Sequence, residues 1–232
     1  MVSQITTGYP TDHKGNTYRR RRPVPAIIIV AVLAVAALTV WIIALTGATG
    51  ETTPVACNRP SPVSASPSPT AATSAPTSSS STVVARDDLI SVSPAPLSAF
   101  TVRVLNASTQ RGAARSASDD LTSLGFTPAA DSAFGDDPLY PNQDLQCVGQ
   151  IRFGPGGKAA AAAVWLAIPC AELVDDGRRD TSVDVALGEY YRPTAQSQDA
   201  QAALDVLRTA DPRNPDSGVE PSLIEAVHSR TC

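Results

Sequence analysis

Histidine is scarce in this chain of 232 residues, which has two histidines, one methionine and four cysteines. His13 lies in a basic N-terminal segment and His228 near the other end of the chain. No C-x-x-C pair accompanies either histidine, so a zinc site is not expected. A serine hydrolase is not supported either, because the chain contains no G-x-S-x-G motif. We therefore expect no metal, no cofactor and no catalytic residues, and we interpret the protein as a non-enzyme.

The chain also has no excess of positive charge over most of its length. Before residue 26, five basic residues face one acidic residue, a charge of +4; after residue 45, thirteen Lys and Arg face 21 Asp and Glu, a charge of −8. A strongly acidic segment repels polyanions at long range, so no nucleic-acid partner is expected. Capture of a phosphate-rich wall polymer by overall charge is disfavoured for the same reason.

Long apolar runs are absent except for one, residues 26–45, in which Thr39 is the only polar residue. Twenty helical residues span about 30 Å, the thickness of a bilayer core. Arg19, Arg20, Arg21 and Arg22 precede the run, and this arrangement predicts a cytoplasmic N-terminus. We therefore expect a single-pass plasma-membrane protein with a cytoplasmic tail, 1–25, and an extracytoplasmic C-terminal part.

Two other interpretations of the apolar run stay open. A cleaved signal peptide usually has a shorter apolar core that ends at a small-x-small site, and the sites after residue 44 match that pattern poorly. Residues 54–57, PVAC, resemble a lipoprotein box but lie well beyond the run. An uncleaved anchor fits the length best.

The next segment, residues 46–81, is expected to be an extracytoplasmic linker. From Pro60 to Ser81 every residue except Val63 is Pro, Ser, Ala or Thr. This composition cannot bury enough apolar surface to fold, so it predicts a semi-extended spacer of at most roughly 70 Å. Residues 82–232 then form one domain with its own core.

Within this domain, strand and helix patterns alternate. Residues 100–106, 147–153 and 182–187 predict strands, and an edge strand is expected near 128–132. Apolar spacing predicts helices at 112–124 (with Gly125 at the left-handed C-terminal position), 158–167, 196–209 and 221–230. The Ala-rich helix 158–167 is apolar nearly all round, so it should be buried. The fold class expected is α/β: a single transmembrane helix plus a small α/β sandwich ectodomain.

Several of these segments resemble the C-terminal domain of the LytR-CpsA-Psr family. The resemblance rests on VRVLNASTQRGAA at 102–114, LTSLGF at 121–126, IRFGPG at 151–156 and VALG at 185–188, within a core of about 100–190. It implies a LytR C-terminal-like fold and an accessory role in the cell envelope. The phosphotransferase domain of the wider family has no counterpart here, so ligase activity is not implied.

All four cysteines follow the apolar run, where disulfides persist. Four cysteines allow three pairings, and sequence does not choose among them. Cys147 begins a predicted strand and Cys170 follows the next helix, so these two could meet, which leaves Cys57 for Cys232.

Two turns are candidate binding elements. Each leaves a strand and opens a helix, so parallel strands would bring both to one sheet edge, where helix N-termini favour anions. The binding candidates are Asn106, Ser108, Gly112, Gly154, Gly156, Gly157 and Lys158. Ordinary turn and capping preferences also explain every one of these residues.

We expect, on these grounds, an anchored envelope protein whose domain binds cell-wall glycan or an envelope protein and supports envelope integrity. One alternative is an accessory subunit that docks a wall-assembling phosphotransferase. Another is a wall-modifying enzyme with an unrecognised site.

Overall fold

The computed structural model describes residue 14 and residues 24–46, 55–60, 81–193, 195–214, 218–229 and 232. The chain divides into two compact units, Met1–Glu51 and Thr52–Cys232. The first unit contains helix α1, Val24–Thr46, whose described side chains are those of residues 25–38. Within the described parts of the chain, no helix combines the length and apolar character needed to cross a membrane.

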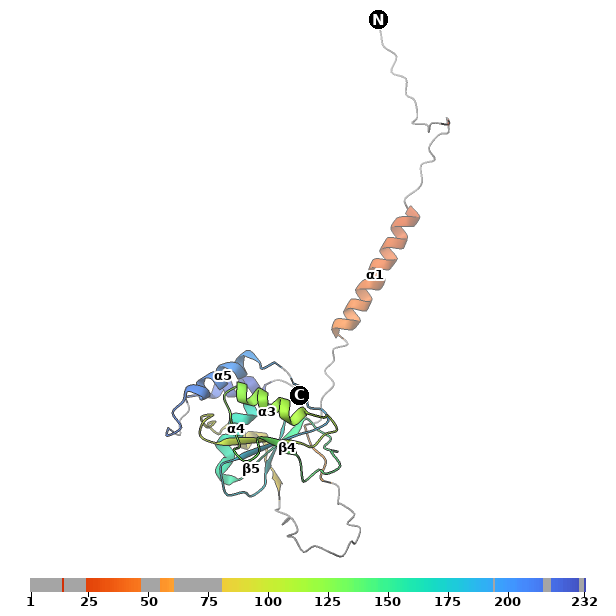
Figure 1. Cartoon of the computed structure of the whole chain (residues 1–232). Helices are drawn as coiled ribbons and strands as arrows, with labels where there is room; N and C mark the ends of the chain where they lie inside the picture. Colours follow the sequence, from red (N-terminus) through yellow and green to blue (C-terminus); the bar gives the residue numbers. More distant parts are fainter. Residues whose placement is uncertain are drawn as a thin grey trace, which may run out of the picture. The chain divides into compact units, whose positions relative to one another are not determined.

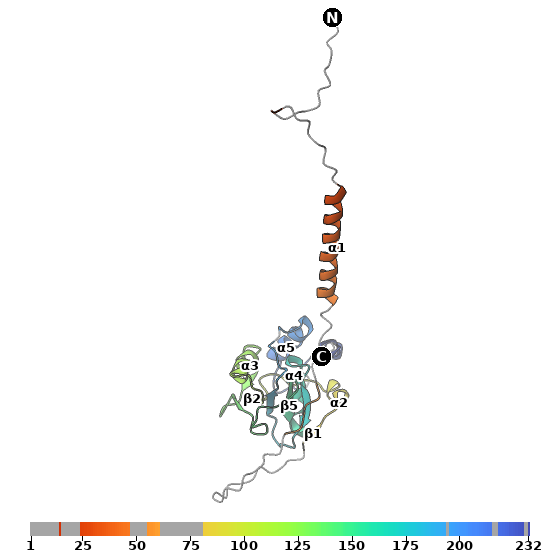
Figure 2. The ribbon, with the colours of Figure 1, turned by 90° about the vertical axis from the view of Figure 1, so that its right-hand side faces the viewer.

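The second unit is built on one mixed sheet. Its strands are β1 (Thr82–Val83), β2 (Thr101–Asn106), β3 (Thr127–Pro128), β4 (Phe134–Asp136), β5 (Gly149–Phe153), β6 (Glu172–Asp175) and β7 (Val183–Leu187). The order across the sheet is β1-β6-β5-β7-β2-β3, with β4 also paired to β2. Figure 2 shows β2 on one side of the sheet, β5 near the middle and β1 on the other side.

The helices of the second unit lie on one face of this sheet (Figure 1). They are α2 (Arg86–Ile90), α3 (Ala113–Ser123), α4 (Lys158–Ala167), α5 (Gln198–Thr209) and α6 (Pro221–His228), with a 3-10 turn at Pro155–Gly157 before α4. Strand residues such as Val104, Ile151 and Val185 point into this layer and are at most 1 % exposed. The α/β architecture is therefore confirmed, as one helical layer packed on one sheet.

Every strand and helix predicted within this unit has an observed counterpart, but β1, α2 and β6 have none among the predicted elements. Helix α3 ends before Gly125, which has φ +103°, as expected for a left-handed C-terminal position. Helix α4 is buried from Ala160 to Ala167, as its all-apolar pattern predicted. The single edge strand expected near 128–132 is instead two short strands, β3 and β4, which both pair in parallel with β2.

The opposite face of the sheet carries a smaller apolar cluster under an irregular cover. Its members are Leu105, Ala107, Tyr140, Leu145, Cys147 and Ala186, with Cys57 packed against them. The cover consists of the loop between β4 and β5 together with residues 55–60. Asn58 holds the two together, because its side chain donates to the Asp144 carbonyl oxygen at 3.0 Å and accepts from the Gln146 N–H at 2.7 Å.

This arrangement corrects the expected disulfide pairing. The bridges are Cys57–Cys147 and Cys170–Cys232, and not Cys147–Cys170 and Cys57–Cys232. Cys147 and Cys170 flank β5 and α4, but Cys147 belongs to the small cluster and Cys170 packs against the helical core. The two lie on opposite faces of the sheet, which the order of elements along the chain does not reveal.

The first bridge also corrects the linker boundaries. Residues 55–60 belong to the folded unit, so the expected 46–81 spacer does not run uninterrupted to a domain that begins at 82. Pro60 and Ser81 line one and the same cavity, so the chain leaves and re-enters the domain at one place. The Pro/Ser/Thr/Ala-rich residues between them lie outside the described residues.

Candidate functional site

The first candidate turn, after β2, is an internally bonded structure. The Asn106 side-chain oxygen accepts from the Ser108 N–H and hydroxyl at 3.2 and 2.9 Å, and its amide donates to the Gln110 carbonyl at 3.2 Å. Asn106 is 6 % exposed and Ser108 is fully buried. Gly112 has φ +78°, a conformation that favours glycine. The polar atoms of this turn are thus bonded within the turn or to Glu189, which anchors it to the chain after β7.

The second candidate turn, after β5, is shaped by close packing. A Cβ at Gly154 would collide with the carbonyl oxygen of Arg178, so a side chain does not fit there. Gly157 is buried, whereas Gly156 and the Lys158 side chain are exposed. Close backbone approach therefore explains Gly154 without a ligand.

The expectation that both turns share one sheet edge is wrong. Strand β7 pairs in parallel with β2 but antiparallel with β5. Strands β2 and β5 therefore run in opposite directions, and their C-terminal turns lie at opposite edges of the sheet. The seven residues proposed from sequence do not form one site.

A network of charged groups lies on the face of the sheet opposite the helices. Arg152 donates to Asp137 at 3.1 Å and to Gln150 at 2.9 and 3.1 Å, and its side chain is only 4 % exposed. Asp184 forms ion pairs with Arg103 and Arg178, and these guanidinium groups hold the pKa of Asp184 below its usual value despite burial. Each of these charges has an oppositely charged neighbour, which indicates that they fix the sheet and its cover rather than bind a ligand.

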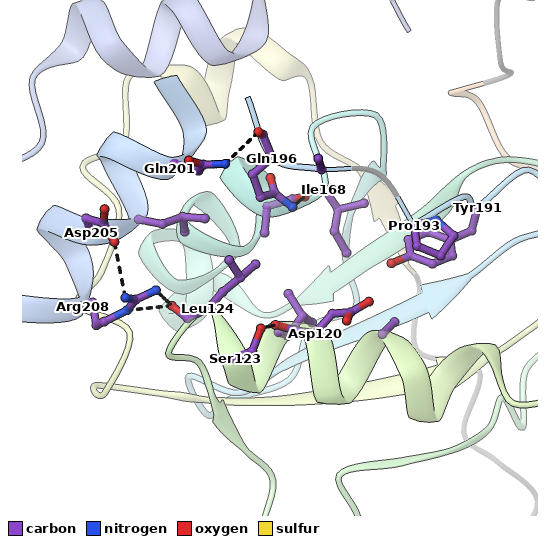
Figure 3. Close-up of a pocket in the computed structure, with 15 residues that line it drawn as sticks. Asp120, Ser123, Leu124, Ile168, Tyr191, Pro193, Gln196, Gln201, Asp205 and Arg208 are labelled. Carbon is purple, nitrogen blue, oxygen red and sulfur yellow. Dashed lines mark hydrogen bonds and ion pairs between the residues drawn. The ribbon is translucent and has the colours of Figure 1, made fainter. Parts of the chain in front are cut away.

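The helical side has a groove between α3, α5 and the chain after β7 (Figure 3). Its volume is about 580 Å³. The floor is aliphatic, and the lining consists of Ala117, Asp120, Leu121, Ser123, Leu124, Ala167, Ile168, Tyr191, Pro193, Ala195, Gln196, Gln201, Leu204, Asp205 and Arg208. In Figure 3, Tyr191 and Pro193 lie at one end of the groove, and Asp205 and Arg208 lie at the other.

Hydrogen-bond acceptors dominate the polar groups of this groove. Asp120 and Asp205 are both exposed carboxylates. The one cation of the lining, Arg208, donates to the Leu124 carbonyl at 2.9 and 3.1 Å and contacts Asp205 at 3.4 Å, so it closes the end of α3. Burial and the nearby Asp120 raise the pKa of Tyr191, whose ring is half-buried. The tyrosine is therefore neutral and can donate a hydrogen bond at neutral pH.

Sequence reasoning missed this groove entirely. Asp120, Tyr191 and Asp205 come from three separate segments, and no local motif links them. Asp120 lies on the polar side of the predicted helix 112–124, where solvation alone explains an acidic residue. Among the described residues, no group of His, Cys, Asp and Glu is arranged to hold a metal ion.

Comparison with known proteins adds to this geometry. Residues 99–191 match the family described as LytR cell envelope-related transcriptional attenuator. The chain is 41 % identical over 232 residues to the cell envelope integrity protein Cei of Mycobacterium tuberculosis, and the match covers 100 % of both chains. A crystal structure of the soluble domain of a conserved hypothetical secreted protein from Mycobacterium marinum matches with a TM-score of 0.58 and 42 % identity, over 65 % of this chain and 97 % of that one. The chain therefore belongs to the family of the cell envelope integrity protein Cei, with a LytR C-terminal domain at its core.

Proposed function

We propose that this protein is a non-catalytic, membrane-anchored envelope protein that supports cell-envelope integrity by binding neutral wall glycan in the groove between α3 and α5. The acceptor-rich groove beside Tyr191 is the observation that carries the proposal. The name of the Cei relative, a cell envelope integrity protein, supports the cellular role.

Membrane anchoring rests on the apolar run and its arginine flank. Helix α1 has 23 residues, and its described apolar side chains, such as Ile27 and Leu33, are 58–65 % exposed. A helix that is apolar all round needs a non-aqueous environment, which a bilayer provides.

The chemistry of the groove fits a ligand rich in hydroxyl groups. Asp120, Asp205 and the glutamine side-chain oxygens accept hydrogen bonds, and an aromatic ring beside an aliphatic floor suits the apolar face of a sugar. The same carboxylates repel phosphate, and Arg208 is already engaged by Leu124 and Asp205. A neutral glycan is therefore favoured over an anionic one.

A non-catalytic role agrees with the placement of the chain's second histidine. His228 is 3 % exposed and stacks on Trp165 with ring centroids 3.6 Å apart. Its ring nitrogens have no hydrogen-bond partner among the described residues, so no described hydroxyl or thiol is activated by it.

Sedimentation of the soluble unit, starting at Thr52, with purified wall polysaccharide tests the proposal. Asp120→Asn and Tyr191→Ala should each weaken binding by about 5- to 30-fold, since each removes the charge from a hydrogen bond or a ring contact, worth about 1–2 kcal/mol. Asp119→Asn and Tyr190→Ala are matched controls, because these neighbours are absent from the groove lining. Wild-type protein that stays in the supernatant, or equal binding by groove and control variants, would contradict the proposal. Binding to a wall-assembling enzyme without binding to the glycan would favour the accessory-subunit alternative.

A further inference from the structure

Three buried nitrogen atoms near the end of α6 have no hydrogen-bond partner among the described residues. They are Nε1 of Trp165 and both ring nitrogens of His228. Each side chain is 3 % exposed. A buried polar group without a partner costs roughly 1–3 kcal/mol, so three in one place require an explanation.

Two cavities adjoin this stacked pair. One, of about 280 Å³, is lined by Trp165 and by mainly apolar residues, which are Val55, Ala56, Val83, Val84, Pro169, Ala171 and Leu173, together with Arg86, Glu172 and Cys232. The other, of about 250 Å³, is lined by His228 among others. Arg86, Pro169 and Cys232 line both cavities, so the two are neighbours. The apolar cavity by itself is close to the lower size limit of a small-molecule site, about 300 Å³.

The fold brings these walls together from distant parts of the chain. The Cys170–Cys232 bridge holds residue 232 beside the end of α4, and β1 pairs antiparallel with β6 to place Val83 next to Val174. Val55 and Val83 remain 41 % and 62 % exposed. The apolar cavity is therefore reached past exposed apolar side chains, unlike a sealed packing defect.

Arg86 supplies a positive charge at the junction of the two cavities. Its guanidinium carbon lies 5.5 Å from the centre of the Trp165 ring, and no described carboxylate forms an ion pair with it. Burial and this guanidinium lower the pKa of His228 to about 4, which keeps the imidazole neutral. Glu172 also lines the cavity, but its oxygens accept hydrogen bonds from the Cys57 N–H and the Gln150 amide.

We propose that this cavity binds an amphiphile with a linear acyl chain and an anionic head group. The chain would lie among Val55, Val83 and Leu173, and the head group would contact Arg86. The site is separate from the glycan groove. The proposal rests on the proposed membrane anchor only for the source of the ligand.

The unit from Thr52 provides a direct test, since it is compact by itself and a domain of the 42 % identical relative that covers 65 % of this chain was crystallised without the rest of its own chain. Trp165 is its only tryptophan, because Trp41 lies in α1. Sodium dodecanoate and dodecyl phosphate, added below their micelle concentrations, should each change Trp165 fluorescence saturably. Butyrate, which lacks the chain, and dodecyltrimethylammonium, which reverses the charge, should not.

Matched variants assign the response to the cavity. Ala56→Phe places a ring at an exposed position of the lining, Arg86→Gln removes the charge, and each should weaken dodecanoate binding by at least about tenfold. Ala130→Phe and Arg115→Gln are the controls; Arg115 also lies over a ring, that of Phe134 at 5.7 Å, but lines neither cavity. Absence of a saturable response, or equal responses of lining and control variants, would overturn the proposal. If Ala56→Phe loses dodecanoate binding but still binds wall polysaccharide, the cavity and the glycan groove are separate sites.

Discussion

Replacing either Arg152 or Asp137 alone should strongly destabilise the domain, because the two side chains form a buried ion pair. The two side chains are 4 % and 0 % exposed and approach to 2.7 Å. Arg152→Met leaves a buried carboxylate without its cation, and Asp137→Leu leaves a buried guanidinium without its anion. Each single change should lower the free energy of unfolding by about 3–5 kcal/mol. In a unit of this size the melting temperature should fall by roughly 6–20 °C.

Denaturant unfolding of the unit Thr52–Cys232, followed by far-ultraviolet circular dichroism, measures this effect. The Arg152→Met/Asp137→Leu double variant should recover most of the loss, because an apolar pair avoids the desolvation of both charges. Asp205→Asn is the control: its pair with Arg208 is exposed, so the change should cost less than about 1 kcal/mol. Single variants that lose under about 1 kcal/mol, or a double variant no better than either single one, would refute the argument.

Three further changes test other parts of the fold. Because the pKa of His228 is lowered to about 4, the unfolded chain takes up a proton between pH 6.5 and 4 that the folded chain does not. The free energy of unfolding should therefore fall by roughly 3 kcal/mol as the pH drops through this range. In unfolding measured at several pH values, His228→Gln should make the free energy of unfolding depend less steeply on pH. Peptide mapping should recover the pairs Cys57–Cys147 and Cys170–Cys232, and reducing either bridge should cost up to about 4–5 kcal/mol. Gly154→Ala should destabilise the domain by more than about 1 kcal/mol, measured as a lower melting temperature, because its Cβ meets a backbone oxygen; an unchanged melting temperature would contradict this.

Much of the local structure could be predicted because it depends on neighbours along the chain. The spacing of Ala117, Leu121 and Leu124 predicts α3, and the glycine at 125 ends it with a positive φ. Alternating apolar residues predict β2 and β7, whose inward side chains are buried. In each case a few adjacent residues carry the periodicity, capping or backbone preference that defines the element.

The candidate site could not be predicted in this way. Both proposed turns exist, but they would meet only if β5 ran parallel to β2. The relative direction of two strands depends on how the strands pair across the sheet, and here β5 is antiparallel to β7 while β2 is parallel to it. The groove joins Asp120, Tyr191 and Asp205 from three elements, and the residues of such a site need no shared pattern in sequence. Exposed acidic residues and one tyrosine carry no local signal of a site.

The sequence by itself determined the apolar run with its arginine flank, most of the element types, the oxidised cysteines and the family resemblance, because composition and short-range spacing encode all of these. Only the tertiary structure decided the bridge partners, the inclusion of residues 55–60 in the folded unit, and the cavity beside Trp165 and His228. Each of these depends on which face of the sheet a segment covers. The packing of segments that are distant in sequence decides which face each one covers. The residues next to a single cysteine or histidine in the sequence do not indicate that face.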